Sequence, residues 1–102
     1  MVAPGRIEAE LFDVNGYFDT TPLNLGGQFR LQEAVDIERT LDVDGNFHVG
    51  WMRAGEWLQY TVNVLESGDY RAEFRVASAN GGGQLVLLMD NYGQVGPINI
   101  VP

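Results

Sequence analysis

The stretch HVGWMRAGEWLQYTVNV, from His48 to Val64, decides the fold of this chain. Its second half alternates between an apolar set (Leu58, Tyr60, Val62 and Val64) and a polar set that includes one indole (Trp57, Gln59, Thr61 and Asn63). Because successive side chains of a strand point to opposite faces, this alternation predicts a strand with one face toward the core and one toward water. We therefore expect Trp57 and Gln59 on the wet face of a sheet.

Outward from this stretch, turn signals rich in Gly, Asn and Ser recur, for example at residues 24–27, 54–55, 66–69 and 80–83. The runs between the later signals have strand length rather than helix length. Residues 70–77 alternate as well, so we expect a hairpin with residues 56–64, and residues 85–89, apolar on both parities, suit a strand covered on both faces. The predicted fold class is all-β, an antiparallel sandwich, in a single domain over residues 1–102.

The charge balance narrows the range of partners. The 102 residues carry 14 acidic side chains against 6 basic ones, a formal net charge of -8. An acidic surface repels phosphate groups, so nucleic acid and membranes are not expected as partners, whereas neutral ligands and cations remain. The chain has no Cys, which excludes disulfides, thiol catalysis and Cys-type zinc sites. No apolar run approaches the roughly 20 residues of a membrane-spanning helix.

Catalytic chemistry has little support in this sequence. A hydrolytic triad is not expected, because the chain has one His and its serines, Ser67 and Ser78, both lie beside turns. Glycoside hydrolysis needs a pair of carboxylates. Among so many acidic residues some pair is always available, so its presence is weak evidence for glycosidase activity. We expect no enzyme, and a small glycoside-active enzyme remains the less favoured alternative.

Two carboxylates near the N-terminus suggest a cation site. If residues 7–10 form an edge strand, Glu8 and Glu10 lie on one face and repel each other unless a cation or an Arg lies between them. Calcium favours paired carboxylates completed by backbone carbonyls, which the turn at residues 26–28 can supply. A solvated edge with Arg6 as counter-ion explains the same spacing equally well.

The tryptophans suggest a second kind of site. Sugar rings have apolar C–H faces that pack on indole rings, with polar side chains at the rim. Trp51 follows a strand end, where exposed side chains commonly serve binding, although a Trp there can also cap the core. His48 has no partner His, so a hydrogen-bonding rim residue is favoured over a metal ligand.

Several segments together resemble one known family: RIEAELFD, DTTPLNLGGQFR, VDIERT, FHVGWMRAGEWLQYTVNV, SGDYRAEFRVASANGGG and GPINIVP. They are similar, in order and over essentially the whole chain, to the family 6 carbohydrate-binding modules. This resemblance implies a non-catalytic jelly-roll domain of a secreted, multidomain glycoside hydrolase, with a signal peptide outside this chain. The implied ligand is a polysaccharide such as β-1,3-glucan, xylan or agarose. A calcium-stabilised adhesion sandwich without sugar binding is the alternative.

The resemblance also implies roles for individual residues. Trp51 matches the aromatic platform of a loop-end cleft, with Asp19 and His48 nearby, and Trp57 matches the aromatic of a second site on the sheet face, beside Gln59. Glu8 and Glu10 match the carboxylates of a structural calcium site, with backbone from Gln28 to Arg30 as further ligands.

One departure from the family bears on the loop-end cleft. The chain ends before the segment that normally supplies a second Trp, a sugar-binding Asn and the last strands. We therefore expect a sandwich lacking its last strands, a weak loop-end cleft, and a Trp57 site that survives.

Overall fold

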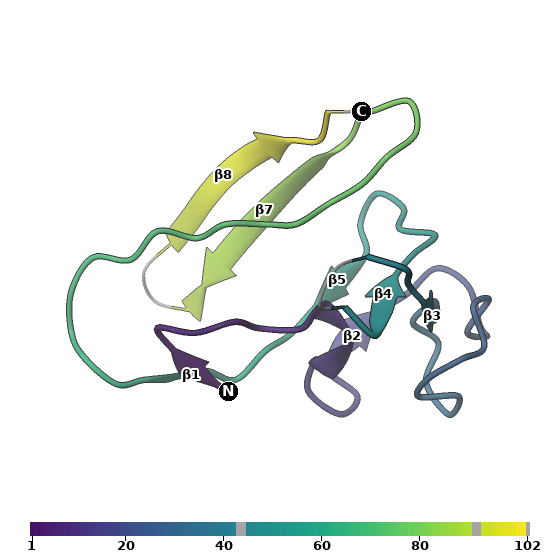
Figure 1. Cartoon of the computed structure of the whole chain (residues 1–102), viewed down its shortest axis with the longest axis horizontal. Coiled ribbons are helices and arrows are strands. Elements are labelled where there is room, and N and C mark those ends of the chain that lie inside the picture. The colour runs from purple at the N-terminus through teal and green to yellow at the C-terminus, as the bar shows by residue number, and fades with distance from the viewer. Residues whose placement is uncertain (43–44, 91–92, 102) are drawn as a thin grey trace. The chain divides into compact units, whose positions relative to one another are not determined.

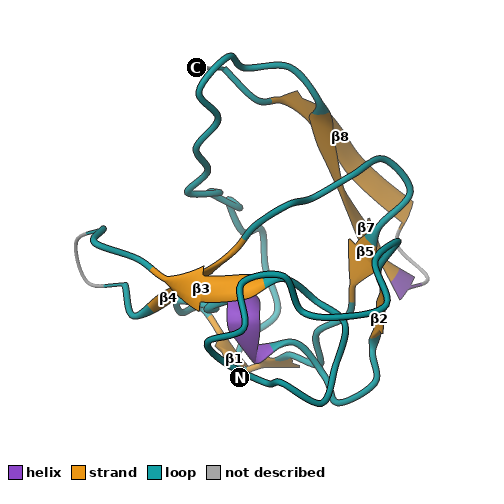
Figure 2. Ribbon diagram, turned by 90° about the vertical axis from the view of Figure 1, so that its right-hand side faces the viewer, coloured by secondary structure: helices purple, strands orange, loops and turns teal. Residues whose placement is uncertain are grey.

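The computed structural model describes residues 1–42, 45–90 and 93–101. In these residues the regular structure is nearly all β-strand, with very little helix (Figures 1 and 2). The predicted all-β class is therefore confirmed. The chain divides into two compact units, Met1–Asp69 and Tyr70–Pro102, which are described separately below. The single domain over residues 1–102 stays a prediction.

The first unit consists of short strands from distant parts of the sequence. In chain order they are β1 (Val2–Ala3), the 3-10 helix η1 (Ala9–Leu11), β2 (Tyr17–Phe18), β3 (Ile37–Arg39), β4 (Phe47–Val49), β5 (Trp57–Leu58) and β6 (Asn63–Val64). Strand β2 pairs with β5 and β3 with β4, both antiparallel, whereas β1 and β6 are parallel. Helix η1 packs against β4, and Figure 2 shows it beside the β3–β4 ribbon.

The core of this unit is small and centred on β3. Phe12, Val35 and Ile37 are buried, and six partly buried side chains pack around them: Tyr17, Phe29, Phe47, Val49, Leu58 and Tyr60. The rings of Phe29 and Phe47 stack with centroids 4.7 Å apart, and Phe12 meets Tyr17 edge to face at 5.8 Å. Aromatic side chains therefore supply much of the apolar area removed from water.

The alternation predicted for the Trp57 strand is confirmed between Glu56 and Val62. It is wrong at Val64, which was expected on the core side and is half-exposed, because the stretch forms two short strands, β5 and β6, rather than one. Leu58 and Tyr60 pack against the core, whereas Trp57 and Gln59 are exposed. The Tyr60 hydroxyl donates to the Ala9 carbonyl at 2.6 Å, and burial raises the pKa of Tyr60 to about 12. Tyr60 thus stays protonated and ties this strand to η1.

The second unit contains an antiparallel hairpin of β7 (Gln84–Met89) and β8 (Gly93–Asn99), with a register shift between Leu85 and Leu87 (Figure 1). We expected residues 85–89 to form a strand covered on both faces. In the described residues Val86, Leu88 and Met89 are exposed, so this expectation is wrong. The sheet of this unit has two strands here, and such a sheet leaves both faces open unless another layer covers it.

Two further expectations about strands differ from the structure. Residues 70–77 are not in a strand, and β5 and β6 pair instead with β2 and β1. Residues 7–10 are not an edge strand either, because the Leu11 N–H donates to the Glu8 carbonyl at 3.0 Å and closes a helical turn. The Arg30 guanidinium fixes this turn by donating to the carbonyls of Glu10 at 3.0 Å and Phe12 at 2.5 Å.

The approach of residue 26 to β3 yields a stability prediction. A Cβ at Gly26 would overlap the Ile37 carbonyl, which belongs to the backbone and cannot move aside cheaply. Gly26→Ala should therefore lower the free energy of unfolding by about 1–3 kcal/mol, measured in urea. Gly50→Ala is the matched control, because its Cβ meets only the His48 ring at 3.5 Å and should leave stability unchanged or slightly raised. Equal urea midpoints for Gly26→Ala and the wild type would contradict the packing described here.

Candidate functional site

Two exposed aromatic side chains lie directly opposite each other on β2 and β5. Phe18 pairs with Trp57 in the antiparallel register, and 49% of Phe18 and 51% of Trp57 is exposed. Their strand neighbours Tyr17 and Leu58 pack against the core from the other face. Paired residues of a sheet point to the same side, so both rings stand on the outer face. We call the outward set Phe18, Trp57, Gln59, Thr61 and Asp13 the Trp57 face.

Polar groups of Gln59 and Thr61, together with the distant Asp13, continue the Trp57 face. The Asp13 carboxylate accepts hydrogen bonds from the Thr61 hydroxyl at 2.7 Å, the Thr61 N–H at 3.1 Å and the Gln59 amide at 3.3 Å. The Thr61 hydroxyl is the main cause that lowers the pKa of Asp13 below its ordinary value. The face thus joins an apolar platform to fixed donors and acceptors, which is the chemistry that recognises a sugar.

The Glu56 carboxylate holds the start of β5 in place. It accepts from the Thr20 N–H at 2.8 Å, the Thr20 hydroxyl at 2.7 Å and the Arg53 N–H at 2.7 Å. Burial alone would raise the pKa of Glu56, but these hydrogen bonds outweigh it and lower the pKa. Glu56 therefore stays ionised and fixes the residue before Trp57 to the segment after Phe18.

Trp51 stands apart from this face, in the turn after β4. Its φ of 52° is a left-handed conformation uncommon for a non-Gly residue, and 46% of it is exposed. The preceding Gly50 donates its N–H to the backbone carbonyl of buried Asp36 at 2.8 Å. With almost half of its surface exposed, Trp51 does not cap the core, and its role as a sugar platform stays a prediction.

Asp19 is connected to the same turn through Asp36. The Thr21 hydroxyl lies 2.7 Å from the Asp19 carboxylate and 3.3 Å from both carboxylate oxygens of Asp36. Asp36 also accepts from the Leu25 N–H at 2.6 Å. One buried residue thus joins the Asp19 loop, through its carboxylate, to the strand end that carries Trp51, through its backbone carbonyl.

His48 lies on β4 opposite Glu38 of β3, and its Nε2 is 3.0 Å from the Glu38 carboxylate. Both side chains are more than one-third exposed. His48 is thus a surface residue, and its role as a rim residue of a sugar site stays a prediction.

The two predicted calcium carboxylates come close together but in different surroundings. Glu8 is partly exposed and pairs with Arg6 at 2.9 Å, so Arg6 is its counter-ion although residues 7–10 form no edge strand. Glu10 is only 5% exposed. Burial raises the pKa of Glu10, its own backbone hydrogen bond and Arg6 lower it, and the negative charge of Glu8 raises it further. A cation between them would offset both the burial and the repulsion.

Gln28 and Arg30 can offer calcium only their backbone carbonyls. The Gln28 side-chain oxygen accepts a hydrogen bond from the Arg39 N–H. The Arg30 guanidinium is positively charged, lies over the Phe12 ring at 3.6 Å and bonds Glu33 at 2.6 Å. Its Nη2 is buried without a partner among the described residues.

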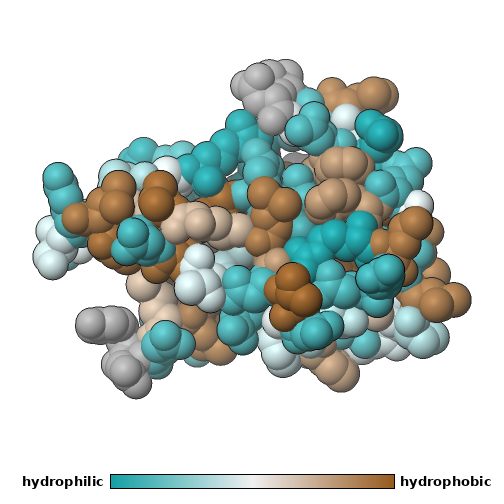
Figure 3. Space-filling model, turned by 90° about the horizontal axis from the view of Figure 1, so that it is seen from below, coloured by the Kyte–Doolittle hydropathy of each residue, from teal (hydrophilic) through white to brown (hydrophobic). Residues whose placement is uncertain are grey.

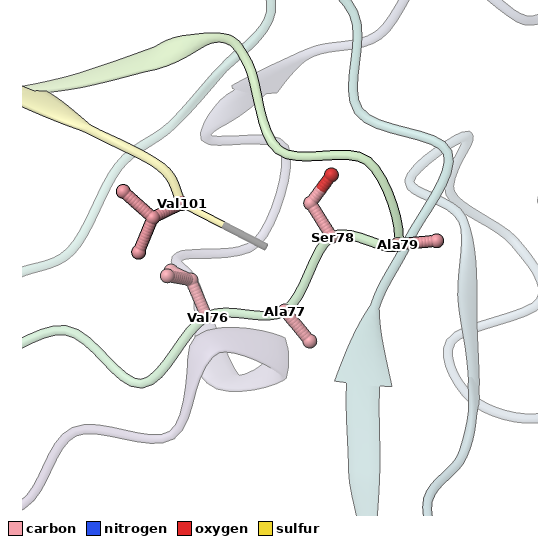
Figure 4. A pocket seen from close by; sticks show the side chains of 5 residues that line it. All are labelled: Val76, Ala77, Ser78, Ala79 and Val101. Atoms are coloured by element: carbon pink, nitrogen blue, oxygen red, sulfur yellow. The ribbon is translucent and has the colours of Figure 1, made fainter.

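Other features of the described residues add no competing site. They contain no group of three or more His, Asp or Glu side chains placed to hold a metal ion. Apolar side chains reach the surface among hydrophilic ones, as Figure 3 shows for one face. A hollow in the second unit is lined by Val76, Ala77, Ser78, Ala79 and Val101 (Figure 4). Its one hydroxyl, from Ser78, bonds the Gly81 carbonyl at 3.3 Å, so nothing in it is set for chemistry.

Sequence reasoning missed three residues of these sites. Phe18 follows Tyr17, and in a strand one of two consecutive aromatic residues must face away from the core. Asp36 stands between Val35 and Ile37, and a charged residue inside a buried run requires hydrogen-bond partners. Asp13 carries no signal of this kind, because its partners are 46 and 48 residues away.

Comparison with known proteins identifies the family of this chain. Residues 27–99 match the family described as carbohydrate binding module (family 6). The chain is also 34% identical over 84 residues to the clotting factor G alpha subunit of Tachypleus tridentatus. That match covers 81% of this chain and 11% of the relative, so the chain spans about a tenth of that protein.

The network at Asp13 leads to a prediction about pH. Thr61→Val removes the hydroxyl that chiefly lowers the Asp13 pKa, so this pKa should rise toward its ordinary value in a titration of the carboxyl group followed by NMR. Because the pKa of Asp13 is lower in the folded chain than in the unfolded chain, ionised Asp13 stabilises the fold at pH values above its unfolded pKa. This stabilisation is lost as the pH falls through the folded pKa. The stability difference between wild type and Thr61→Val should therefore shrink in acid. Thr61→Ser, which keeps the hydroxyl, is the control, and an unchanged Asp13 pKa in Thr61→Val would refute the assignment.

Proposed function

The chain belongs to the family 6 carbohydrate-binding modules, and we propose that it binds a neutral polysaccharide through the Trp57 face, without catalysis. Candidate ligands are β-1,3-glucan, xylan and agarose. The observation that carries the proposal is the exposure of Trp57 beside fixed polar groups on a strand whose other face is in the core. A sugar would stack its C–H face on the indole and exchange hydrogen bonds with Gln59 and its neighbours.

The polar groups on this face suit binding better than hydrolysis. A general acid for glycoside cleavage needs a carboxyl group with a raised pKa, whereas the pKa of Asp13 is lowered and its carboxylate already accepts three hydrogen bonds. Asp13 therefore acts as an acceptor that fixes Gln59 and Thr61.

The charge of the chain supports the choice of neutral glycans. With a formal net charge of -8, the surface disfavours ligands rich in uronate or sulfate groups. Stacking on an aromatic ring needs no ionic partner. The ligand class that remains is an uncharged polysaccharide.

The loop end is proposed as a weaker second surface. Trp51 is exposed, with Asp19 and His48 as candidate rim residues. The Asp19 carboxylate already accepts a hydrogen bond from the Thr21 hydroxyl, and His48 already pairs with Glu38. Both polar groups would therefore have to share these partners with a sugar. Trp57 has a second exposed aromatic directly opposite it, which favours the sheet face as the main site.

We also propose a structural calcium ion at Glu8 and Glu10, completed by backbone carbonyls near Gln28 and Arg30. Buried Glu10, raised in pKa by desolvation and by Glu8, supports this site. All ligands in this set are oxygen atoms, as calcium requires. Arg6 pairs with one carboxylate oxygen of Glu8, so the arginine would compete with the ion for that carboxylate.

In the larger protein, we propose that the chain serves as one module of a secreted, multidomain protein such as a glycoside hydrolase. The curated relative is about nine times longer than the matched part, which supports a modular context. No helix in the described residues is long and apolar enough to cross a membrane. A tethered binding module raises the effective concentration of its attached partner at an insoluble polysaccharide.

Substitution of each Trp tests the assignment of the main site. In affinity gel electrophoresis with laminarin, xylan, agarose and hydroxyethylcellulose, at least one glycan should retard the wild-type chain. Trp57→Ala should weaken that retardation about tenfold or more, because it removes the stacking surface. Trp51→Ala is the matched control and should have the smaller effect. The proposal fails if Trp51→Ala abolishes retardation while Trp57→Ala leaves it intact.

Removal of calcium tests the metal site. Calcium at about a hundred times its dissociation constant should raise the free energy of unfolding by about 2.7 kcal/mol over chelator. Glu10→Gln should lose this gain, whereas Glu73→Gln, at an exposed position, should keep it. Because protons compete for Glu10, whose pKa is raised, the gain should be larger near neutral pH than in acid. An equal calcium response in wild type and Glu10→Gln would remove Glu10 from the site.

A further inference from the structure

Phe18 is a large apolar side chain that the core does not use. It is about half exposed and is absent from the core cluster and the side chains packed around it. Ring contacts in the described residues join Phe12 to Tyr17 and Phe29 to Phe47, and do not join Phe18 to Trp57. Single exposed apolar residues are normal, so exposure by itself shows nothing.

The position of Phe18 in the ladder is what distinguishes it. Phe18 and Trp57 are direct partners in the β2–β5 register. Residues opposite each other in an antiparallel pair have Cβ atoms about 4.5–5.5 Å apart, on the same face. The two rings therefore form one apolar strip across the two strands, with the polar groups of Gln59 and Thr61 on the same side.

Both rings stand on backbone that is held in place. After Phe18, the Asp19 carboxylate accepts from the Thr21 N–H at 3.0 Å and the Thr21 hydroxyl at 2.7 Å. Before Trp57, Glu56 accepts from the Thr20 N–H and hydroxyl. The segment after one ring is thus tied to the residue before the other, which lowers the ordering needed when a ligand binds.

Building on the proposed function, we infer that Phe18 is a second stacking residue of the Trp57 face. It takes the sugar next to the one stacked on Trp57, so the face recognises a neutral glycan through consecutive residues of the chain. A sugar covering one ring alone would leave the other half-exposed, whereas a chain lying across β2 and β5 removes both from water.

The test compares substitutions that distinguish the effect of the aromatic ring from the effect of side-chain size. Wild type, Phe18→Ala, Phe18→Leu, Phe18→Tyr and Trp57→Ala are run in affinity gels with laminarin, xylan, agarose and hydroxyethylcellulose, and their thermal unfolding is measured in parallel. Leu41→Ala, at a fully exposed apolar position, is the control. Phe18→Ala should weaken retardation about tenfold at an unchanged unfolding midpoint, Phe18→Leu should restore little, and Phe18→Tyr should restore most of it.

The outcomes separate this inference from the proposed function. If no glycan retards the wild type, the proposed function fails and the inference falls with it. If Trp57→Ala abolishes retardation while Phe18→Ala has no effect, the inference is overturned and the proposed function stands. If Phe18→Ala lowers both the unfolding midpoint and the retardation, and Phe18→Leu restores both, Phe18 only stabilises the β2–β5 pair. The inference is then again overturned.

Discussion

The alternation of side chains along residues 56–62 is the constraint on which the site depends. Leu58 and Tyr60 pack against a core of three buried apolar residues. Because successive side chains point to opposite faces, Trp57 and Gln59 must face outward. A slip of one residue in the β2–β5 register would bury Gln59 and expose Leu58. Packing of Leu58 and Tyr60 in the core therefore places the Trp57 indole on the solvent side. The pairing of β5 with β2 places Phe18 opposite it. The same chain segment thus contributes side chains to the core on one face and to the proposed binding surface on the other.

Asp36 is the second determinant, and it acts through burial. A carboxylate with no exposed surface is costly unless hydrogen bonds replace water. Asp36 accepts from the Leu25 N–H at 2.6 Å and shares the Thr21 hydroxyl, at 3.3 Å, with Asp19. Its backbone carbonyl accepts from Gly50. The loop that contains Asp19 and the turn that contains Trp51 are thus held by one residue, although they lie more than 20 positions apart in sequence. Long-range hydrogen bonding, rather than regular structure, organises this end of the unit.

Local periodicity could be predicted from sequence, and long-range pairing could not. The alternation around Trp57 rests on a period of two that any strand imposes, so its wet and dry faces follow from the residues alone. The turn at residues 8–11 was missed because Arg30, about 20 residues away, fixes carbonyls that an edge strand would leave open. Residues 70–77 have the same alternation as the Trp57 strand, yet a strand also needs a partner, which composition does not specify.

The acidic composition links the proposed ligand to the proposed ion. A net charge of -8 on 102 residues opposes the compact state through self-repulsion, most strongly where a carboxylate is buried. Glu10 is such a place, because Glu8 adds to the desolvation that already raises its pKa. A bound calcium ion would turn this repulsion into attraction while leaving the rest of the surface negative. That surface has little to offer an anionic polymer, so aromatic stacking on uncharged sugars is the recognition chemistry that the same composition favours.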